Sequence, residues 1–258
     1  MARQLIITID GDGFIYRTNS DGRPVGAVIY EKVLTRYPFR FCASFIAGET
    51  TLYADEFDLD LAREILSLQN VDAASHSWSH PHDWTQDVDL EQEIDQSVRH
   101  INQHMLPPGK TVSAFLWTGL CNPTPVAVAR TEQLGLVNLN GGNVRQPFSR
   151  REAATHYHAR ARSDWYWMDV SGLMKRYSAT KVYPFLCDFP GSLGGYERII
   201  QYFETHTDQP VHLHIHWYSA VRKDSFEALT NVLDWCLGQE LESVSVPQYI
   251  DAVRRSGT

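Results

Sequence analysis

The chain has 258 residues, of which 43% are hydrophobic, 12% aromatic and 21% charged. This composition is typical of a folded globular protein and excludes a disordered or fibrous chain. Lysine and arginine total 23 against 31 aspartate and glutamate residues, which gives a formal net charge of −8 and makes nucleic acid and anionic membranes poor partners. No Gly/Ser/Pro-rich linker divides residues 1–258, so the sequence predicts a single domain.

Targeting signals and cysteine chemistry narrow the possibilities further. No apolar stretch approaches the ~18 residues of a membrane helix, and the apolar run 5–9 is too short for the core of a signal peptide. As written, the sequence predicts a cytoplasmic protein, or a domain of an exported protein that works in the periplasm or outside the cell. Cys42, Cys121, Cys187 and Cys236 form no C-x-x-C pair, so the sequence indicates no cysteine-rich zinc site and predicts buried free thiols at Cys42 and Cys236.

Short β-rich runs alternate with helical patterns along the whole chain. In order, the first half predicts strands and helices at residues 5–9 (strand), 24–37 (helix), 41–46 (strand), 58–68 (helix), 71–74 (strand), 90–105 (helix) and 112–117 (strand). The second half predicts them at 125–134 (helix), 136–139 (strand), 181–186 (strand), 195–205 (helix), 211–217 (strand), 225–237 (helix), 243–246 (strand) and 247–254 (helix). Residues 143–178 form the least regular part, interpreted as a long loop with one irregular strand. This alternation favours a parallel sheet with helices outside, closed as a barrel.

Two carboxylates follow the first predicted strand directly. Asp10-Gly11-Asp12-Gly13 stands where the strand ends, and functional groups of parallel α/β folds gather at the C-terminal ends of strands. The glycines allow a tight turn there. The alternative is an ordinary turn in which both aspartates bond local N–H groups.

A histidine pair follows the third predicted strand. His76 and His80 are four residues apart, so on a helical turn they would share one face and could bind one metal ion. A lone pair of this kind more often has a structural role, but Asp12 can add a carboxylate from a neighbouring strand end. Two imidazoles, one carboxylate and open water positions suit Zn²⁺, with Co²⁺ as the alternative, as an activator of water.

Three histidines alternate along a late strand. His212, His214 and His216 therefore point to one side of it. His216 lies nearest the C-terminal end and is the candidate general acid, because the pKa of histidine is tunable near neutrality. For His212 and His214 a structural, hydrogen-bonded role in the interior is favoured.

Aromatic side chains lie next to these candidate catalytic residues. Trp78, Trp117, Trp217 and Tyr218 are the candidates for substrate binding, since sugar rings stack on flat aromatic faces. Most aromatic residues of the chain are expected to pack in the core.

The combined motifs resemble the NodB-homology polysaccharide deacetylases of carbohydrate esterase family four, and within them the deacetylase domains of Pel exopolysaccharide proteins. The residues that carry this resemblance are Ile9-Asp10-Gly11-Asp12-Gly13-Phe14, Ala74-Ser75-His76-Ser77-Trp78-Ser79-His80-Pro81, Trp117-Thr118-Gly119, Cys121-Asn122-Pro123, Asn140-Gly141-Gly142 and His216-Trp217-Tyr218-Ser219. The resemblance implies a distorted (β/α)7–8 barrel and a divalent metal. It also implies an enzyme that removes N-acetyl groups from an amino-sugar polymer, as in exopolysaccharides of biofilms.

The resemblance also implies a role for each site residue. Asp10 becomes the general base, His216 the general acid, and Asp12, His76 and His80 the metal ligands. The wider family carries an arginine after the fourth strand that orients the base, whereas this chain has Trp117-Thr118-Gly119-Leu120-Cys121 there, which leaves open what orients Asp10. Two alternatives remain: an inactive relative that binds polysaccharide, and a metal-dependent amidase for a small non-sugar substrate.

Overall fold

The computed structural model describes residues 3–119, 123–139, 165–168, 185–188, 200, 203–205, 207 and 210–255. One sheet runs through these residues. Its order is β5 (Val137–Leu139), β4 (Ala114–Leu116), β3 (Val71–Ser75), β2 (Phe41–Phe45), β1 (Arg3–Asp10), β8 (Val211–His216), β7 (Phe185–Asp188) and β6 (Trp165–Met168), and β9 (Leu241–Ser243) also pairs with β1. The described pairings are parallel except that of β6 with β7.

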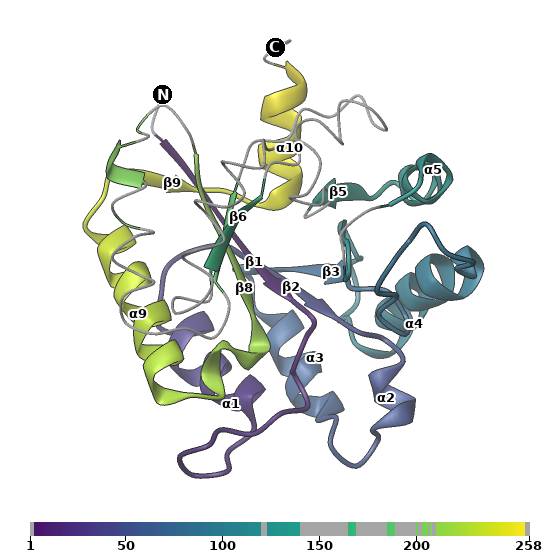
Figure 1. Ribbon diagram of the computed structural model, residues 1–258, viewed down its shortest axis with the longest axis horizontal. Helices are drawn as coiled ribbons and strands as arrows, with labels where there is room; N and C mark the ends of the chain where they lie inside the picture. Colours follow the sequence, from purple (N-terminus) through teal and green to yellow (C-terminus); the bar gives the residue numbers. More distant parts are fainter. Residues whose placement is uncertain are drawn as a thin grey trace.

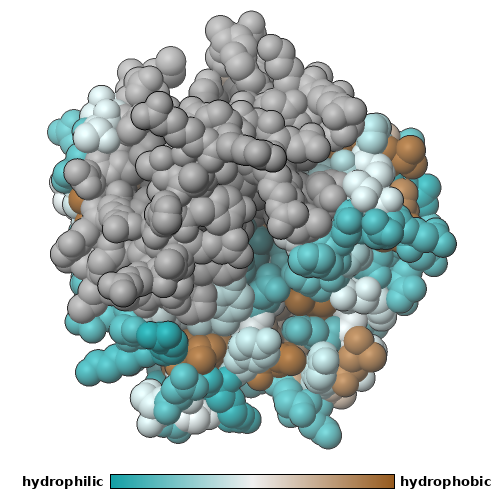
Figure 2. Space-filling model, viewed as in Figure 1, coloured by the Kyte–Doolittle hydropathy of each residue, from teal (hydrophilic) through white to brown (hydrophobic). Residues whose placement is uncertain are grey.

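Helices surround this sheet (Figure 1). They are α1 (Val25–Ile29) continued by the π-helix η1 (Tyr30–Leu34), α2 (Glu49–Leu52), α3 (Leu59–Ser67), the π-helix η2 (Glu91–Gln96) continued by α4 (Ser97–His104), α5 (Pro125–Gln133), the 3-10 helix η3 (Trp217–Ala220), α9 (Lys223–Leu237) and α10 (Val246–Arg255). Within the described part of the chain, none of the helices has the length and apolar character needed to span a membrane. On the coloured part of the face in Figure 2, hydrophobic residues form small separate spots among hydrophilic ones.

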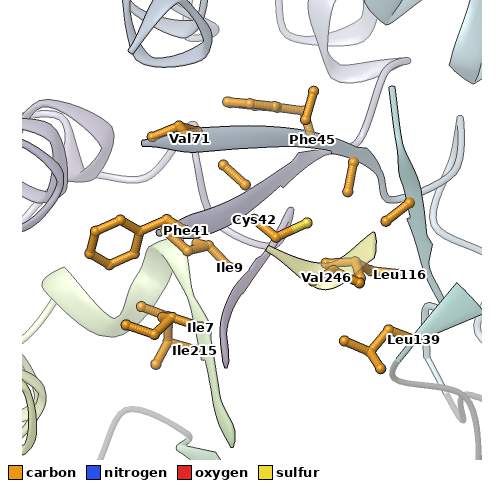
Figure 3. Packing of buried hydrophobic residues seen from close by; sticks show 14 of the residues in the cluster. Ile7, Ile9, Phe41, Cys42, Phe45, Val71, Leu116, Leu139, Ile215 and Val246 are labelled. Carbon is orange, nitrogen blue, oxygen red and sulfur yellow. The ribbon is translucent and has the colours of Figure 1, made fainter. Parts of the chain in front are cut away.

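The centre of the sheet is formed by β1 and β8, whose residues pair from Leu5 with Val211 to Asp10 with His216. Alternate residues of a strand face opposite sides, and paired residues of parallel neighbours face the same side. Ile7, Ile9 and Ile215 are buried and belong to the apolar cluster in Figure 3. The other face of the same two strands carries Thr8, Asp10 and the three histidines of β8. The middle of the sheet is therefore apolar on one face and polar on the other.

The α/β barrel-like fold predicted from the alternating pattern is confirmed. The sheet is a curled half-barrel in which β5 and β6 stand at the two ends of the strand order. Helix α10 contacts both β1 and β5 and so lies across the curl. The two buried thiols predicted at Cys42 and Cys236 are also found.

Several local predictions need correction. The sheet is not wholly parallel, because β6 runs antiparallel to β7. The last strand lies at Leu241–Ser243 instead of 243–246, since it must align with Arg3–Leu5 at the start of β1. Helix α2 was not predicted, because its four residues are too few for a helical periodicity. Most of 143–178 and of the helix predicted at 195–205 lies outside the described residues.

Candidate metal centre

The candidate site is built where β1, β2 and β3 end. These three neighbouring strands are parallel, so the loops that follow them meet at one edge of the sheet. Asp10 is the last residue of β1, and His76 follows β3 directly. A Cβ atom at Gly11 would lie 2.9 Å from both Cβ of His76 and the backbone nitrogen of Ile46. Only glycine lets the three loops pack this closely.

Two imidazoles converge on one carboxylate. Nε2 of His76 lies 3.1 Å from Oδ2 of Asp12, and Nε2 of His80 lies 3.0 Å from Oδ1. Their ligand atoms lie within 4.8 Å of one another. Nδ1 of His76 donates to the Leu116 carbonyl at 2.9 Å, which leaves Nε2, once it has lost its proton, as the nitrogen available to a cation. The donor set of two nitrogens and one carboxylate fits a divalent transition metal.

The spacing of the histidine pair suggested a helical turn, but the pair does not lie on one. Residues 76–80 form a loop in which Ser77 and His80 adopt positive φ angles of 65° and 61°. These are uncommon values for residues other than glycine, and such backbone is held by its surroundings. Here the Ser77 hydroxyl accepts from the backbone N–H of His80 at 3.0 Å, and the Ser75 hydroxyl accepts from that of Ser77 at 3.2 Å.

A buried glutamate outside the predicted site holds the same loop. The carboxylate of Glu93, in η2, accepts from the backbone N–H groups of Trp78 at 3.0 Å and Ser79 at 2.8 Å, and from the Ser79 hydroxyl at 2.6 Å. Single-turn π-helices often mark functional sites, because the extra residue redirects side chains. No sequence pattern indicates this role, since Glu93 is one of several charged residues in a predicted amphipathic helix.

A second cluster lies deeper, around Asp10. Its Oδ2 atom is 3.1 Å from Nε2 of His214 and 3.8 Å from Nε2 of His76. Nδ1 of His214 lies 3.3 Å from the Thr8 hydroxyl, which is also 3.5 Å from Nε2 of His212. In the neutral ring, Nε2–H donates to Asp10 and Nδ1 accepts from Thr8. His214, expected to have only a structural role, therefore orients Asp10 where the sequence had left that question open.

The charges of Asp10, Asp12 and His76 strongly affect one another's pKa values. Burial raises the pKa of Asp10, but the interactions with His214 and His76 outweigh this effect and hold that pKa below its usual value. Burial also raises the pKa of Asp12, but the hydrogen bonds and charge interactions with His76 and His80 together outweigh it and hold that pKa well below its usual value. Burial disfavours the charged form of His76, yet the adjacent Asp10 and Asp12 raise its pKa to about 9. The two carboxylates are therefore ionised at neutral pH.

His216 has an environment unlike the one expected for a cationic acid. Its ring accepts a hydrogen bond from the backbone N–H of Ser219, and it stacks on Tyr218 with ring centres 4.4 Å apart. Burial, followed by the interaction with His214, lowers the pKa of His216 to about 4. The ring is neutral at pH 7, and its proton lies on the nitrogen that does not accept from Ser219.

The lowered pKa of His212 predicts a loss of stability in acid. Burial, followed by the interaction with His214, lowers this pKa to about 3, against about 6.5 in an unfolded chain. The stabilisation is complete above pH 6.5 and declines as pH falls toward 3, because only the unfolded state takes up the proton. Between pH 7 and 5, urea unfolding of the metal-free protein should show a loss about 2 kcal/mol smaller in His212→Gln than in the wild type.

The exposed Gln103 offers a control for this experiment, because its side chain does not titrate. Gln103→Asn should lose as much stability between pH 7 and 5 as the wild type. Equal losses in His212→Gln and the wild type would show that His212 takes up a proton as readily in the folded state as in the unfolded one.

The four aromatic candidates divide into two pairs. Trp117 and Trp217 are 0% exposed, so neither offers a ring face to a ligand. Trp117 packs edge-on against Trp84, and Nε1 of Trp217 donates to the Ser44 carbonyl at 3.0 Å. We therefore correct their predicted role from substrate binding to core packing. Trp78 and Tyr218 are partly exposed, and the backbone N–H of Tyr218 bonds the Asp12 carbonyl at 3.3 Å.

Similar folds occur among solved structures. One is the crystal structure of 4-alpha-glucanotransferase from Thermococcus litoralis, with a TM-score of 0.55 and 14% identity over 97% of this chain. This chain spans only 40% of that protein's length. Another is PuuE allantoinase, with a TM-score of 0.59, 12% identity, and coverage of 98% of this chain and 90% of the allantoinase. Likeness at such low identity concerns the fold, and the same fold supports many chemistries.

The predicted membership of the NodB-homology deacetylases, and of the Pel subgroup, is wrong. Neither a protein-family model nor a curated protein matches the sequence. Similar solved structures include a glucanotransferase and an allantoinase instead. Any parallel α/β fold places its functional groups at the ends of strands. The order of short polar motifs at strand ends therefore does not by itself define a family.

Proposed function

We propose that this protein is a metal-dependent hydrolase of amide bonds, and that its substrate is an N-acetylated amino-sugar polymer or oligomer from which it removes acetyl groups. The observation that carries the proposal is the convergence of His76 and His80 on the two oxygens of Asp12, 3.1 and 3.0 Å away. Three such donors at the ends of parallel strands leave further positions of an ion open, as catalytic sites require. The bond from His76 to the Leu116 carbonyl supports a ligand role, because metal-binding histidines donate their second N–H in this way.

In this proposal Asp12, His76 and His80 hold the cation, with Zn²⁺ the first candidate and Co²⁺ the second. When bound, the cation supplies Lewis-acid polarisation of the substrate carbonyl. Asp10, ionised and oriented by the Nε2–H group of His214, accepts the proton of the attacking water. His216, which is neutral at pH 7, donates a hydrogen bond from its remaining N–H to the departing nitrogen. As the C–N bond breaks, that nitrogen takes up the proton that Asp10 has accepted from water, so the step balances with Asp10 as the base and His216 assisting the departure.

An aromatic rim supports a sugar substrate. A Cβ atom at Gly13 would lie 2.7 Å from Cβ of Tyr218 and 3.0 Å from Cδ2 of Tyr16, so both tyrosines approach the same residue of the Asp10–Asp12 loop. Tyr16 is 52% exposed and Tyr218 partly so. Exposed rings next to a polar site are suited to stack on sugar rings. The two similar structures are enzymes by name, one of them acting on glucans, which is compatible with this proposal.

The experiment is a release assay on the purified chain with Zn²⁺, with Co²⁺ and with a chelator. We expect acetate from N-acetylglucosamine oligomers, no release with the chelator, and recovery when the metal is restored. Absence of acetate with every metal would contradict the proposal. Release from small acyl amides but never from the oligomers would instead favour the amidase alternative, and binding of oligomers without release would favour an inactive binding protein.

A further inference from the structure

A further carboxyl group lies beside the candidate metal centre. Glu49 is the first residue of α2, in the loop that follows β2. Strand β2 lies between β1, which leads to Asp12, and β3, which leads to His76. Glu49 is therefore on the loop between those that carry the proposed ligands. Burial, followed by repulsion from Asp12, raises the pKa of its carboxyl to about 7, which agrees with a position near the Asp12 carboxylate.

Glu49 is buried and lacks the partners that such a group normally has. It is 9% exposed, and among the described residues no donor bonds its buried Oε2 atom. Glu49 also forms none of the ion pairs found in that part of the chain. A buried carboxylate with no hydrogen bond or cation is costly, and a bound ion or water is one physical explanation of an unsatisfied group of this kind.

The backbone around Glu49 is fixed to the loop that carries the histidines. The N–H groups of Ala47 and Gly48 donate to the carbonyls of Ser77 at 3.0 Å and Trp78 at 2.9 Å. A Cβ atom at Gly48 would lie 2.5 Å from the Trp78 carbonyl oxygen, so glycine is required for this approach. The position of Glu49 relative to His76 and His80 is therefore set by direct contacts between the two loops.

We infer that Glu49 supplies the second carboxylate of the cation site, acting on the ion held by Asp12, His76 and His80. The inference rests on the metal centre of the proposed function. Glu49 does not belong to the set whose ligand atoms lie within 4.8 Å of one another, so it acts from outside the three direct ligands. The positive charge of the ion would supply the partner that the buried Glu49 carboxyl lacks. This gives the unpartnered carboxyl a physical reason to be buried there.

The test is the affinity of the whole chain for Zn²⁺ and Co²⁺, measured by competition with a chromogenic chelator. Glu49→Gln keeps the shape of the side chain and removes its charge. Loss of a group that supports metal ligands typically weakens metal binding about 10- to 100-fold, and this is the expected result. Glu56→Gln is the matched control, because Glu56 is exposed seven residues further along, and it should bind both metals like the wild type.

Thermal unfolding of the metal-free variants separates this role from a structural one. Glu49→Gln should be no less stable than the wild type without metal, because it removes a buried unpaired carboxyl. If Glu49→Gln does not fold, Glu49→Ala serves as the second variant with the same expected loss of affinity. Equal metal affinity of the folded variant and the wild type would overturn the inference and leave the metal centre intact. A wild-type chain that binds neither metal would instead overturn the proposed function itself.

Discussion

Replacement of Asp12 by asparagine is expected to remove metal binding almost completely and to abolish hydrolysis. Asp12 is the group on which both imidazoles converge, with one histidine at each carboxylate oxygen. Asparagine keeps the shape but loses the charge and one of the two acceptor oxygens. Since groups that merely support ligands cost about 10- to 100-fold in affinity, loss of a direct ligand should cost at least about 100-fold.

Two measurements test this loss of metal affinity: the metal content of the protein after dialysis, and a calorimetric titration with Zn²⁺. Asp55→Asn is the control, because this exposed aspartate lies outside the site and its replacement should leave affinity and activity unchanged. The metal-free Asp12→Asn variant should remain folded, since Asp12 is only partly buried. Unchanged affinity in the variant would show that His76, Asp12 and His80 form a hydrogen-bonded cluster without a metal.

The positions of Asp10, Asp12 and His76 at strand ends could be predicted from the sequence, and the reason is local. Each follows a short buried run directly, and the ends of parallel strands meet at one edge. The conformation that brings His80 beside His76 could not be predicted. It requires positive φ angles at Ser77 and His80, which are unfavourable for residues other than glycine. Hydrogen bonds to residues distant in sequence, such as Glu93, hold the loop in this conformation.

The contact between Asp10 and His214 depends on a register between strands that are about 200 residues apart. Alternation shows that the histidines of β8 share a face, but it does not show which of them reaches Asp10. Pairing of Thr8 with His214 and of Asp10 with His216 brings His214 to the carboxylate. The burial of Glu49 could not be predicted from the sequence either, because it results from the contact between two loops. The predicted substrate-binding role of Trp117 and Trp217 failed for a related reason. Both lie close in sequence to candidate site residues, but their rings are buried.

Replacement of Asp10 by asparagine is expected to lower kcat by about 10² to 10⁴, the contribution typical of a general base, while KM changes little. Asp10 is 3% exposed and keeps its charge because His214 and His76 hold its pKa below the usual value. An amide at this position can still accept from Nε2–H of His214 but cannot take the proton of water. The variant should lose less Zn²⁺ affinity than Asp12→Asn, and no more than the about 10- to 100-fold typical of a group that supports metal ligands, because Asp10 is not one of the three proposed ligands.

The metal affinity of Asp10→Asn is the decisive measurement, because the ligand atoms of Asp10, His214 and His216 also lie within 4.8 Å of one another. These residues already bond one another and Thr8: His214 uses Nε2 for Asp10 and Nδ1 for the Thr8 hydroxyl, and His216 accepts from Ser219. An ion there would have to displace those hydrogen bonds. Steady-state kinetics and metal titration of Asp10→Asn, Asp12→Asn and the Asp55→Asn control therefore distinguish base from ligand. A loss of metal in Asp10→Asn as large as in Asp12→Asn would assign Asp10 to the ion, and retention of more than about a tenth of wild-type kcat would exclude it as the base.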